Sequence, residues 1–141
     1  MIGLDTNVLV RFLVRDDEEQ FERARKLIRR AAQAGEPVSI SLLVLLETEW
    51  VLRSSYKLTK GEILGAFSDL LSAADLSFED EPSIEEALFV WKDSSAQFAD
   101  CLIGARHRAL GCSATATFTR APPNYPGSFL YELREPRLHE C

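Results

Sequence analysis

The sequence predicts an α/β domain in which helices cover both faces of a central, mainly parallel sheet. Short apolar runs alternate with longer segments whose apolar residues recur at helical spacing. This alternation is typical of right-handed strand–helix–strand crossovers. A length of 141 residues suits one domain, and 46% apolar against 27% charged residues can fill its core. We expect a single domain over residues 1–135 and a flexible tail over residues 136–141.

The first strand and helix are predicted from the first 14 residues. Residues 2–4 are a short apolar run that ends at Asp5, and helical spacing begins at Val8 and continues to Val14. Thr6 or Asn7 is expected to cap this helix, because both have short polar side chains that accept backbone N–H groups.

An acidic stretch at residues 16–19 favours the start of a second helix, since acids suit the positive end of the helix dipole. The helix continues to about Gln33, and Gly35 and Pro37 then stop it. Its expected apolar stripe comprises Phe21, Ala24, Leu27, Ile28 and Ala31.

Residues 38–40 are expected to form a buried strand, after which Ser41 caps a very apolar helix over residues 42–54. Thr59-Lys-Gly-Glu62 is a capping box that opens a helix to about Ala73.

Residues 76–78 are a candidate strand, and Ser83-Ile-Glu-Glu86 is a second capping box, expected to open a helix over residues 84–92. A last helix is expected over residues 98–110 and ends at Gly111. The remaining elements are a strand over residues 114–118, a loop forced by Pro122, Pro123 and Pro126, and an edge strand over residues 129–132.

The charge balance is acidic, with 22 acids against 16 bases and a formal net charge of −6. Proteins that coat nucleic acid by charge are basic, because Lys and Arg neutralise the phosphates. The balance disfavours such a protein. It does not disfavour an enzyme that meets phosphate through a bound cation.

Cysteine spacing and apolar runs favour a cytoplasmic protein with no membrane contact. The three cysteines form no CxxC pair, and any disulfide would leave one unpaired. Asp5, Asn7 and Arg11 interrupt the N-terminal apolar stretch, unlike in a signal peptide. The longest apolar run, residues 38–46, is shorter than the roughly 20 residues that cross a bilayer.

Asp5 directly follows the first expected strand. In an open parallel sheet, ligands bind beyond the carboxyl ends of the strands. A lone Asp before a helix is ordinarily a cap, but Thr6 and Asn7 can both fill that role here. Asp5 is therefore a candidate ligand-binding residue.

Glu47 stands on the most apolar helix, with apolar neighbours at helical spacing. A carboxylate in such surroundings is costly to bury unless it is paired or holds a cation. Glu49 has a simpler explanation, since Arg53 lies four residues further on, the favourable order for a surface ion pair. We assign Glu47 to the site and Glu49 to the surface.

Asp100 lies in the first turns of the last helix, where the dipole favours an acid, and the small residues Ala99 and Gly104 leave room beside it. Three carboxylates gathered close together need a counter-charge. Oxygen ligands without a His or Cys cluster select Mg²⁺ or Mn²⁺. Such a cation activates water and grips a phosphodiester, as RNA hydrolysis requires.

Two basic features have ordinary explanations. His107 lies between two arginines near a helix end, where a base suits the dipole, so a surface role is favoured over catalysis. A run of five bases on the second helix follows five acids that nearly balance it, so a solvated face is the simplest interpretation and a role in guiding RNA is the alternative. The five bases are Arg23, Arg25, Lys26, Arg29 and Arg30.

Several short motifs follow one another along the chain. They are Asp5-Thr-Asn-Val-Leu, then Ser41-Leu-Leu-Val-Leu-Leu-Glu47 with Trp50-Val-Leu-Arg53, then Phe98-Ala-Asp100-Cys-Leu-Ile103 with Gly111 and a Thr-rich strand. In this order and spacing the chain resembles the PIN domain, and within it the VapC-type toxin ribonucleases of bacterial toxin–antitoxin pairs. The resemblance extends from residue 1 to about Leu130.

This resemblance implies a three-layer α/β/α domain with Mg²⁺- or Mn²⁺-dependent endoribonuclease activity, a homodimer, and neutralisation by a small antitoxin. Asp5, Glu47 and Asp100 match the first three acids of the family's metal site. Thr6 matches a position that helps to order that site.

The chain departs from the family at one position. The fourth acid usually follows the last core strand, where this chain has Thr119 followed by Arg120. These two residues are expected to contact substrate or to order the site. A threonine hydroxyl is uncharged, so metal affinity should be weaker than with a fourth acid.

Two alternatives to the ribonuclease stay open. One is a catalytically weakened PIN domain that binds an antitoxin or acts as a regulatory module, which Thr119 favours. The other is an aspartyl-phosphate phosphatase or receiver with Asp5 as nucleophile. It is disfavoured because Asn7 stands where such phosphatases have a second acid.

Overall fold

The computed structural model describes residues 1–118, 125 and 130–132. It divides into two compact units, Met1–Glu81 and Pro82–Cys141, and each is described by itself. The single domain expected over residues 1–135 stays a prediction, and the expected tail lies outside the described residues. Within the described part of the chain, none of the helices combines the length and apolar character needed to span a lipid bilayer.

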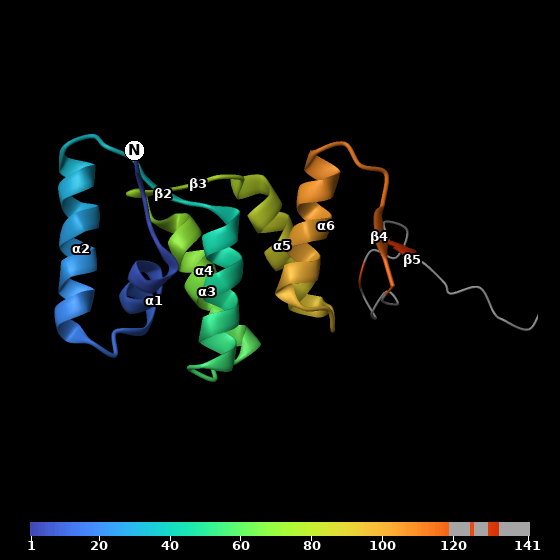
Figure 1. The fold of residues 1–141 in the computed structure, drawn as a ribbon, viewed down its shortest axis with the longest axis horizontal. Coiled ribbons are helices and arrows are strands. Elements are labelled where there is room, and N and C mark those ends of the chain that lie inside the picture. The colour runs from blue at the N-terminus through green and yellow to red at the C-terminus, as the bar shows by residue number, and fades with distance from the viewer. Residues whose placement is uncertain (119–124, 126–129, 133–141) are drawn as a thin grey trace, which may run out of the picture. The chain divides into compact units, whose positions relative to one another are not determined.

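The first unit contains a three-stranded parallel sheet with helices between its strands (Figure 1). The strands adjoin one another in chain order, β1-β2-β3. The predicted α/β/α class with a central, mainly parallel sheet is confirmed. The elements of this unit are β1 (Ile2–Gly3), α1 (Thr6–Val14), α2 (Glu18–Gln33), β2 (Val38–Ile40), α3 (Leu42–Ser54), α4 (Lys60–Ser72) and β3 (Leu76–Phe78).

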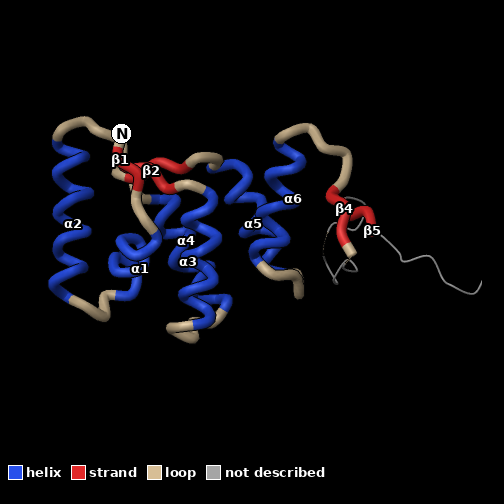
Figure 2. Tube along the Cα trace, viewed as in Figure 1, coloured by secondary structure: helices blue, strands red, loops and turns tan. Residues whose placement is uncertain are grey.

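The strand register brings three chain segments to one edge of this sheet. Gly3 pairs with Ser39 and Ile40 pairs with Phe78, all in parallel. Figure 2 shows β1 and β2 side by side. The N–H of Leu4 donates to the carbonyl of Ser39 at 3.0 Å, so the pairing of the first two strands extends to the residue before Asp5. The carboxyl ends of all three strands therefore meet at one edge, where α1 and α3 begin.

The core of this unit lies between the sheet and its helices. Helix α1 packs against α2 and α3, and α3 packs against α4. The predicted apolar stripe of α2 is buried except for Leu27, which is 37% exposed. The side chains that are at most 1% exposed in this unit are Leu9, Val38, Ile40, Leu45, Thr48, Leu52, Ile63 and Phe67.

The start of α1 differs from the expectation. Neither Thr6 nor Asn7 is the N-cap, because both are already helical. The cap position is Asp5, which has extended backbone angles of φ −80° and ψ 156°. The caps predicted at Ser41 and Thr59 are confirmed, and the capping box between Thr59 and Glu62 is complete.

The second unit contains all of α5 (Glu81–Asp93) except its first residue, and α6 (Phe98–Ala109), β4 (Thr115–Thr117) and β5 (Leu130–Glu132). The last two strands pair in parallel with each other, in a sheet separate from that of the first unit. Helix α6 ends as predicted, since Gly111 adopts the left-handed φ of 88° and its N–H donates to the carbonyl of Arg108 at 2.9 Å.

The capping box predicted at Ser83 is wrong. Helix α5 begins at Glu81, so Ser83 lies in its first turn and is only 2% exposed. Pro82 is compatible with this earlier start, because a proline in the first turn has no N–H that would otherwise need a partner. The loop predicted at Pro122, Pro123 and Pro126 lies outside the described residues.

Candidate functional site

Asp5 leaves the sheet at the carboxyl end of β1 and begins α1. Its side chain is exposed and, within this fully described segment, makes no capping hydrogen bond to the helix. Thr6 is 3% exposed, so the residue that follows Asp5 is fixed in the core. The carboxylate of Asp5 is thus held at a rigid corner and is not used by its own helix.

Glu47 lies in the second turn of α3 and is exposed. Leu43 and Trp50, four residues before it and three after it, are 76% and 57% exposed, so they share its outer face. We expected Glu47 to lie among apolar neighbours, where burial of its carboxylate would cost free energy. That expectation is wrong, because the side chain is exposed. An exposed carboxylate is nevertheless open to a cation.

The start of α3 is anchored by two side-chain hydrogen bonds. The Ser41 hydroxyl accepts from the N–H of Val44 at 3.2 Å. The Glu79 carboxylate, just beyond β3, accepts from the N–H of Leu42 at 2.8 Å. The helix that carries Glu47 is therefore fixed to the same sheet edge from which Asp5 emerges.

Sequence reasoning missed this role of Glu79. Its signal in the sequence is slight, a lone acid directly after a candidate strand. Since the carboxyl ends of neighbouring parallel strands share an edge, an acid in that place can reach the N-terminus of a helix that follows an adjacent strand.

Glu49 forms the predicted ion pair, with 2.9 Å between the Arg53 Nε and its Oε1. Its surface position was wrongly predicted, because Glu49 is only 4% exposed. The buried residues Leu45 and Leu52, four before and three after it, show that this face of α3 points into the core. The hydrogen bond to Glu49 raises the pKa of Arg53 above its ordinary value.

Asp100 is the third residue of α6 and is exposed. Its neighbours Cys101 and Leu102 are each 1% exposed and anchor this turn in the core of the second unit. The Tyr125 hydroxyl donates to the backbone carbonyl of Asp100 at 3.2 Å. Tyr125 is 8% exposed, and burial is the main reason why its pKa is raised above 10.0.

The candidate ligands are divided between the two units. Asp5 and Glu47 belong to the first and Asp100 to the second. Within either unit, the described residues include no group of three or more His, Cys, Asp or Glu side chains placed to hold a metal ion. Thr119 and Arg120 lie outside the described residues. The site composed of Asp5, Glu47 and Asp100 therefore stays a prediction.

Comparison with known proteins gives the family. Residues 2–120 match the PIN domain family. The chain is also similar to a VapC ribonuclease of Aquifex aeolicus (strain VF5), with 27% identity over 117 residues, which is 83% of this chain and 86% of that protein. Since the family match extends over most of its length, the chain belongs to the PIN domain family.

Proposed function

We propose that this protein is a divalent-metal-dependent endoribonuclease that hydrolyses RNA phosphodiester bonds and is the toxin of a toxin–antitoxin pair. The similarity to a VapC ribonuclease supports the substrate and the reaction. The observation that carries the proposal is the Asp5 carboxylate, which lies exposed at the carboxyl end of a parallel strand and makes no capping hydrogen bond to the helix that Asp5 begins.

Asp5, Glu47 and Asp100 would bind Mg²⁺ or Mn²⁺. All three are exposed carboxylates at the N-cap or in the first two turns of their helices, and carboxylate oxygens are the ligands that these ions prefer. When bound, such an ion activates water and stabilises negative charge that develops on a phosphodiester. Thr6 would order the site from the core, and Thr119 and Arg120 would contact the substrate or help to order the site.

The proposal includes partners and a location. We expect a homodimer in the cytoplasm, neutralised by a small antitoxin, because the chain resembles VapC-type toxins along most of its length. Size-exclusion chromatography with light scattering tests the dimer. A small open reading frame beside this one would supply the antitoxin for a binding test.

The activity is tested with purified protein, a pool of structured RNAs and Mn²⁺. We expect cleavage that EDTA stops and that Asp5→Asn abolishes. The matched control is Asp69→Asn, which removes an exposed carboxylate from α4 and should leave cleavage unchanged. Equal loss in both variants, or cleavage that persists in Asp5→Asn, would contradict the assignment of Asp5.

One observation favours a second function, a catalytically weakened PIN domain that acts as an antitoxin-binding or regulatory module. Thr119 stands where the family usually has its fourth acid, so one anionic ligand is missing. Absence of metal-dependent cleavage across the RNA pool, together with retained binding of the antitoxin, would establish this alternative over the ribonuclease.

A further inference from the structure

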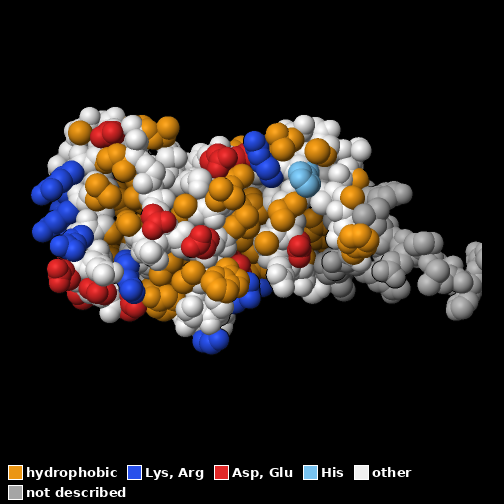
Figure 3. All heavy atoms as spheres, in the orientation of Figure 1, with side chains coloured by type: hydrophobic (Ala, Val, Ile, Leu, Met, Phe, Trp, Pro, Cys, Tyr) orange, Lys and Arg blue, Asp and Glu red, His pale blue; other side chains and the backbone are white. Residues whose placement is uncertain are grey.

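Charged side chains are segregated along α2. Its first half carries Glu18, Glu19 and Glu22, and five bases follow from Arg23 to Arg30. Figure 3 shows the basic side chains gathered on the face of the molecule where α2 lies, with acidic side chains gathered at the helix start. The basic cluster is notable because the chain as a whole has a net charge of −6.

Helix electrostatics explain only part of this cluster. The dipole favours bases in the last turn, and Arg30 is the base found there. Arg25 is held by Glu22, with 2.9 Å between the Arg25 Nη2 and the Glu22 Oε2. Arg23 reaches Glu19 only at 3.9 Å, and both side chains are about four-fifths exposed, so this pair is weak.

Three of the bases form one ridge. Arg23, Lys26 and Arg30 are all exposed and follow one another at i, i+3 and i+7, so they lie on one flank of α2. We name these three residues the basic ridge. Within the described residues, neither Lys26 nor Arg30 lies within ion-pair distance of an acid, although the charge of Lys26, after the bond from Arg25, helps to lower the pKa of Glu22. Both side chains are exposed and can therefore meet an external anion.

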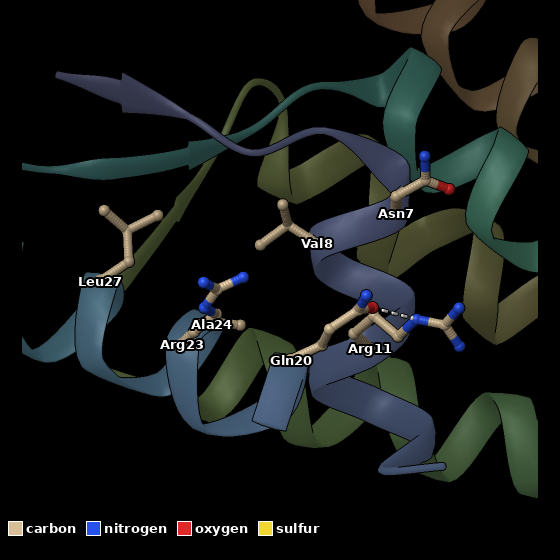
Figure 4. Close-up of a pocket in the computed structure, with 7 residues that line it drawn as sticks. All are labelled: Asn7, Val8, Arg11, Gln20, Arg23, Ala24 and Leu27. Atoms are coloured by element: carbon tan, nitrogen blue, oxygen red, sulfur yellow. Dashed lines mark hydrogen bonds between the residues drawn. The ribbon is translucent and has the colours of Figure 1, made fainter. Parts of the chain in front are cut away.

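Arg23 of the basic ridge lines a groove between α1 and α2. The groove has a volume of about 280 Å³, and its α1 wall begins at Asn7, two residues after Asp5. In Figure 4, Arg23 and Leu27 line the α2 wall, facing Val8 of α1. The complete lining is Asn7, Val8, Arg11, Gln20, Arg23, Ala24 and Leu27.

We propose that the basic ridge binds the phosphate backbone of single-stranded RNA as the strand passes along this groove beside Asp5. The inference rests on the proposed ribonuclease function and names the surface that holds the substrate. Exposed guanidinium and ammonium groups supply positive charge where the acidic chain otherwise repels a polyanion. The apolar side chains of Val8, Ala24 and Leu27 in the groove lining offer a surface for a base beside the phosphates.

The test compares two double variants of the full chain. Arg23→Gln with Arg30→Gln removes two arginines from the ridge, and Arg25→Gln with Arg29→Gln removes two from the opposite flank of the same helix. Both lose the same charge. Binding of a fluorescein-labelled single-stranded RNA is measured by anisotropy in EDTA, over a range of salt concentrations. Thermal unfolding of both variants checks that the fold is kept.

We expect the ridge variant to weaken RNA binding roughly tenfold at about 50 mM salt. Its slope of log affinity against log salt should fall by about 1.4, since each phosphate contact to a single strand contributes about 0.7. The opposite-flank variant should change the slope much less. Equal effects of both variants, or no RNA binding by the unaltered protein, would overturn the proposal.

Two further outcomes separate this inference from the ribonuclease proposal. If the ridge variant keeps full RNA affinity but no longer binds the antitoxin, the ridge serves a protein partner and the inference fails while the ribonuclease stands. If the ridge variant loses RNA affinity but Mn²⁺ produces no cleavage in the unaltered protein, the inference holds and the ribonuclease fails.

Discussion

The carboxylate of Glu79 accepts a hydrogen bond of 2.8 Å from the backbone N–H of Leu42, 37 residues earlier in the chain. The donor is the first residue of α3, where the backbone N–H groups have no partner within the helix and the dipole favours a negative charge. One contact thus connects the end of β3 to the helix that carries Glu47.

Removal of this contact should destabilise the first unit. We expect Glu79→Ala to lower the free energy of unfolding by about 1–2 kcal/mol, the range for loss of a helix cap or of a hydrogen bond to a charged group. Glu79→Gln keeps an acceptor without the charge and should cost less. Urea unfolding followed by circular dichroism measures both.

Glu85→Ala is the matched control for this prediction. Glu85 is an exposed acid of α5, and a surface substitution of this kind usually changes stability by less than about 0.5 kcal/mol. A loss in Glu79→Ala no greater than in the control would show that the Leu42 N–H is equally well satisfied by water.

The buried Glu49 makes Arg53 a second sensitive position. Arg53→Met should lower the free energy of unfolding by about 2 kcal/mol, because it leaves a carboxylate that is 4% exposed without its ion pair. Replacement of both residues, Glu49→Gln with Arg53→Met, should restore part of the loss. Urea unfolding of the two single variants and the double variant tests this coupling.

Arg29→Met is the control here, since Arg29 is an exposed base that makes no ion pair among the described residues. It should leave stability nearly unchanged. Strictly additive effects in the cycle would mean that Glu49 and Arg53 do not stabilise each other.

Local signals predicted much of the fold. Ser41 and the Thr59–Glu62 box cap their helices as expected, because an N-cap depends only on residues within three positions of it. Ser83 fits the same pattern and failed, since the helix can start earlier at Glu81. A local motif shows that a helix can start at a residue, but not that it does.

Facts about burial and distant contacts were harder to predict. The spacing of Glu49 and Arg53 predicts their ion pair, but the face of α3 that enters the core depends on packing against other elements. The Glu79 cap requires the strand register, which brings together residues far apart in the chain. For the candidate site, the sequence motifs identify the acids but not whether they converge.

Low pH should destabilise the first unit, because it protonates Asp16. The Arg11 guanidinium donates to both carboxylate oxygens of Asp16 at 2.8 Å, and the Tyr56 hydroxyl donates to the same carboxylate at 3.0 Å. These hydrogen bonds lower the pKa of Asp16, and the bond from Arg11 has the largest effect. The unfolded chain therefore binds this proton more tightly than the folded one. The stabilisation is present above the ordinary Asp pKa of about 3.9 and is lost as pH falls through the lower folded value.

The stability difference between the unaltered protein and Asp16→Asn should accordingly be constant between about pH 5 and pH 7 and shrink below about pH 4. Urea unfolding at a series of pH values measures it, with Asp69→Asn as the control for an exposed acid. A difference that does not vary with pH would mean that the folded and unfolded pKa values of Asp16 are the same.

Tyr125 should stabilise the position of Asp100 through its hydrogen bond to the backbone carbonyl of that residue. Tyr125→Phe removes the hydroxyl that donates to the Asp100 carbonyl and keeps the buried ring, so we expect a loss of about 1 kcal/mol in unfolding free energy. If Asp100 holds the metal, Mn²⁺ affinity should also fall severalfold, measured by calorimetry. Tyr56→Phe, a change in the first unit, should leave Mn²⁺ affinity unchanged.

Restoration of the missing acid gives a direct test of the metal site. Thr119→Asp should raise Mn²⁺ affinity by about tenfold or more, because an added anionic oxygen strengthens a site of hard carboxylate ligands. Ser95→Asp, which adds the same charge at an exposed position, controls for general attraction of the cation. Calorimetric titration with Mn²⁺ measures the affinity of each variant. An unchanged affinity in Thr119→Asp would place Thr119 outside the site. An equal gain in both variants would show that the added negative charge alone, and not a new ligand, raises the affinity.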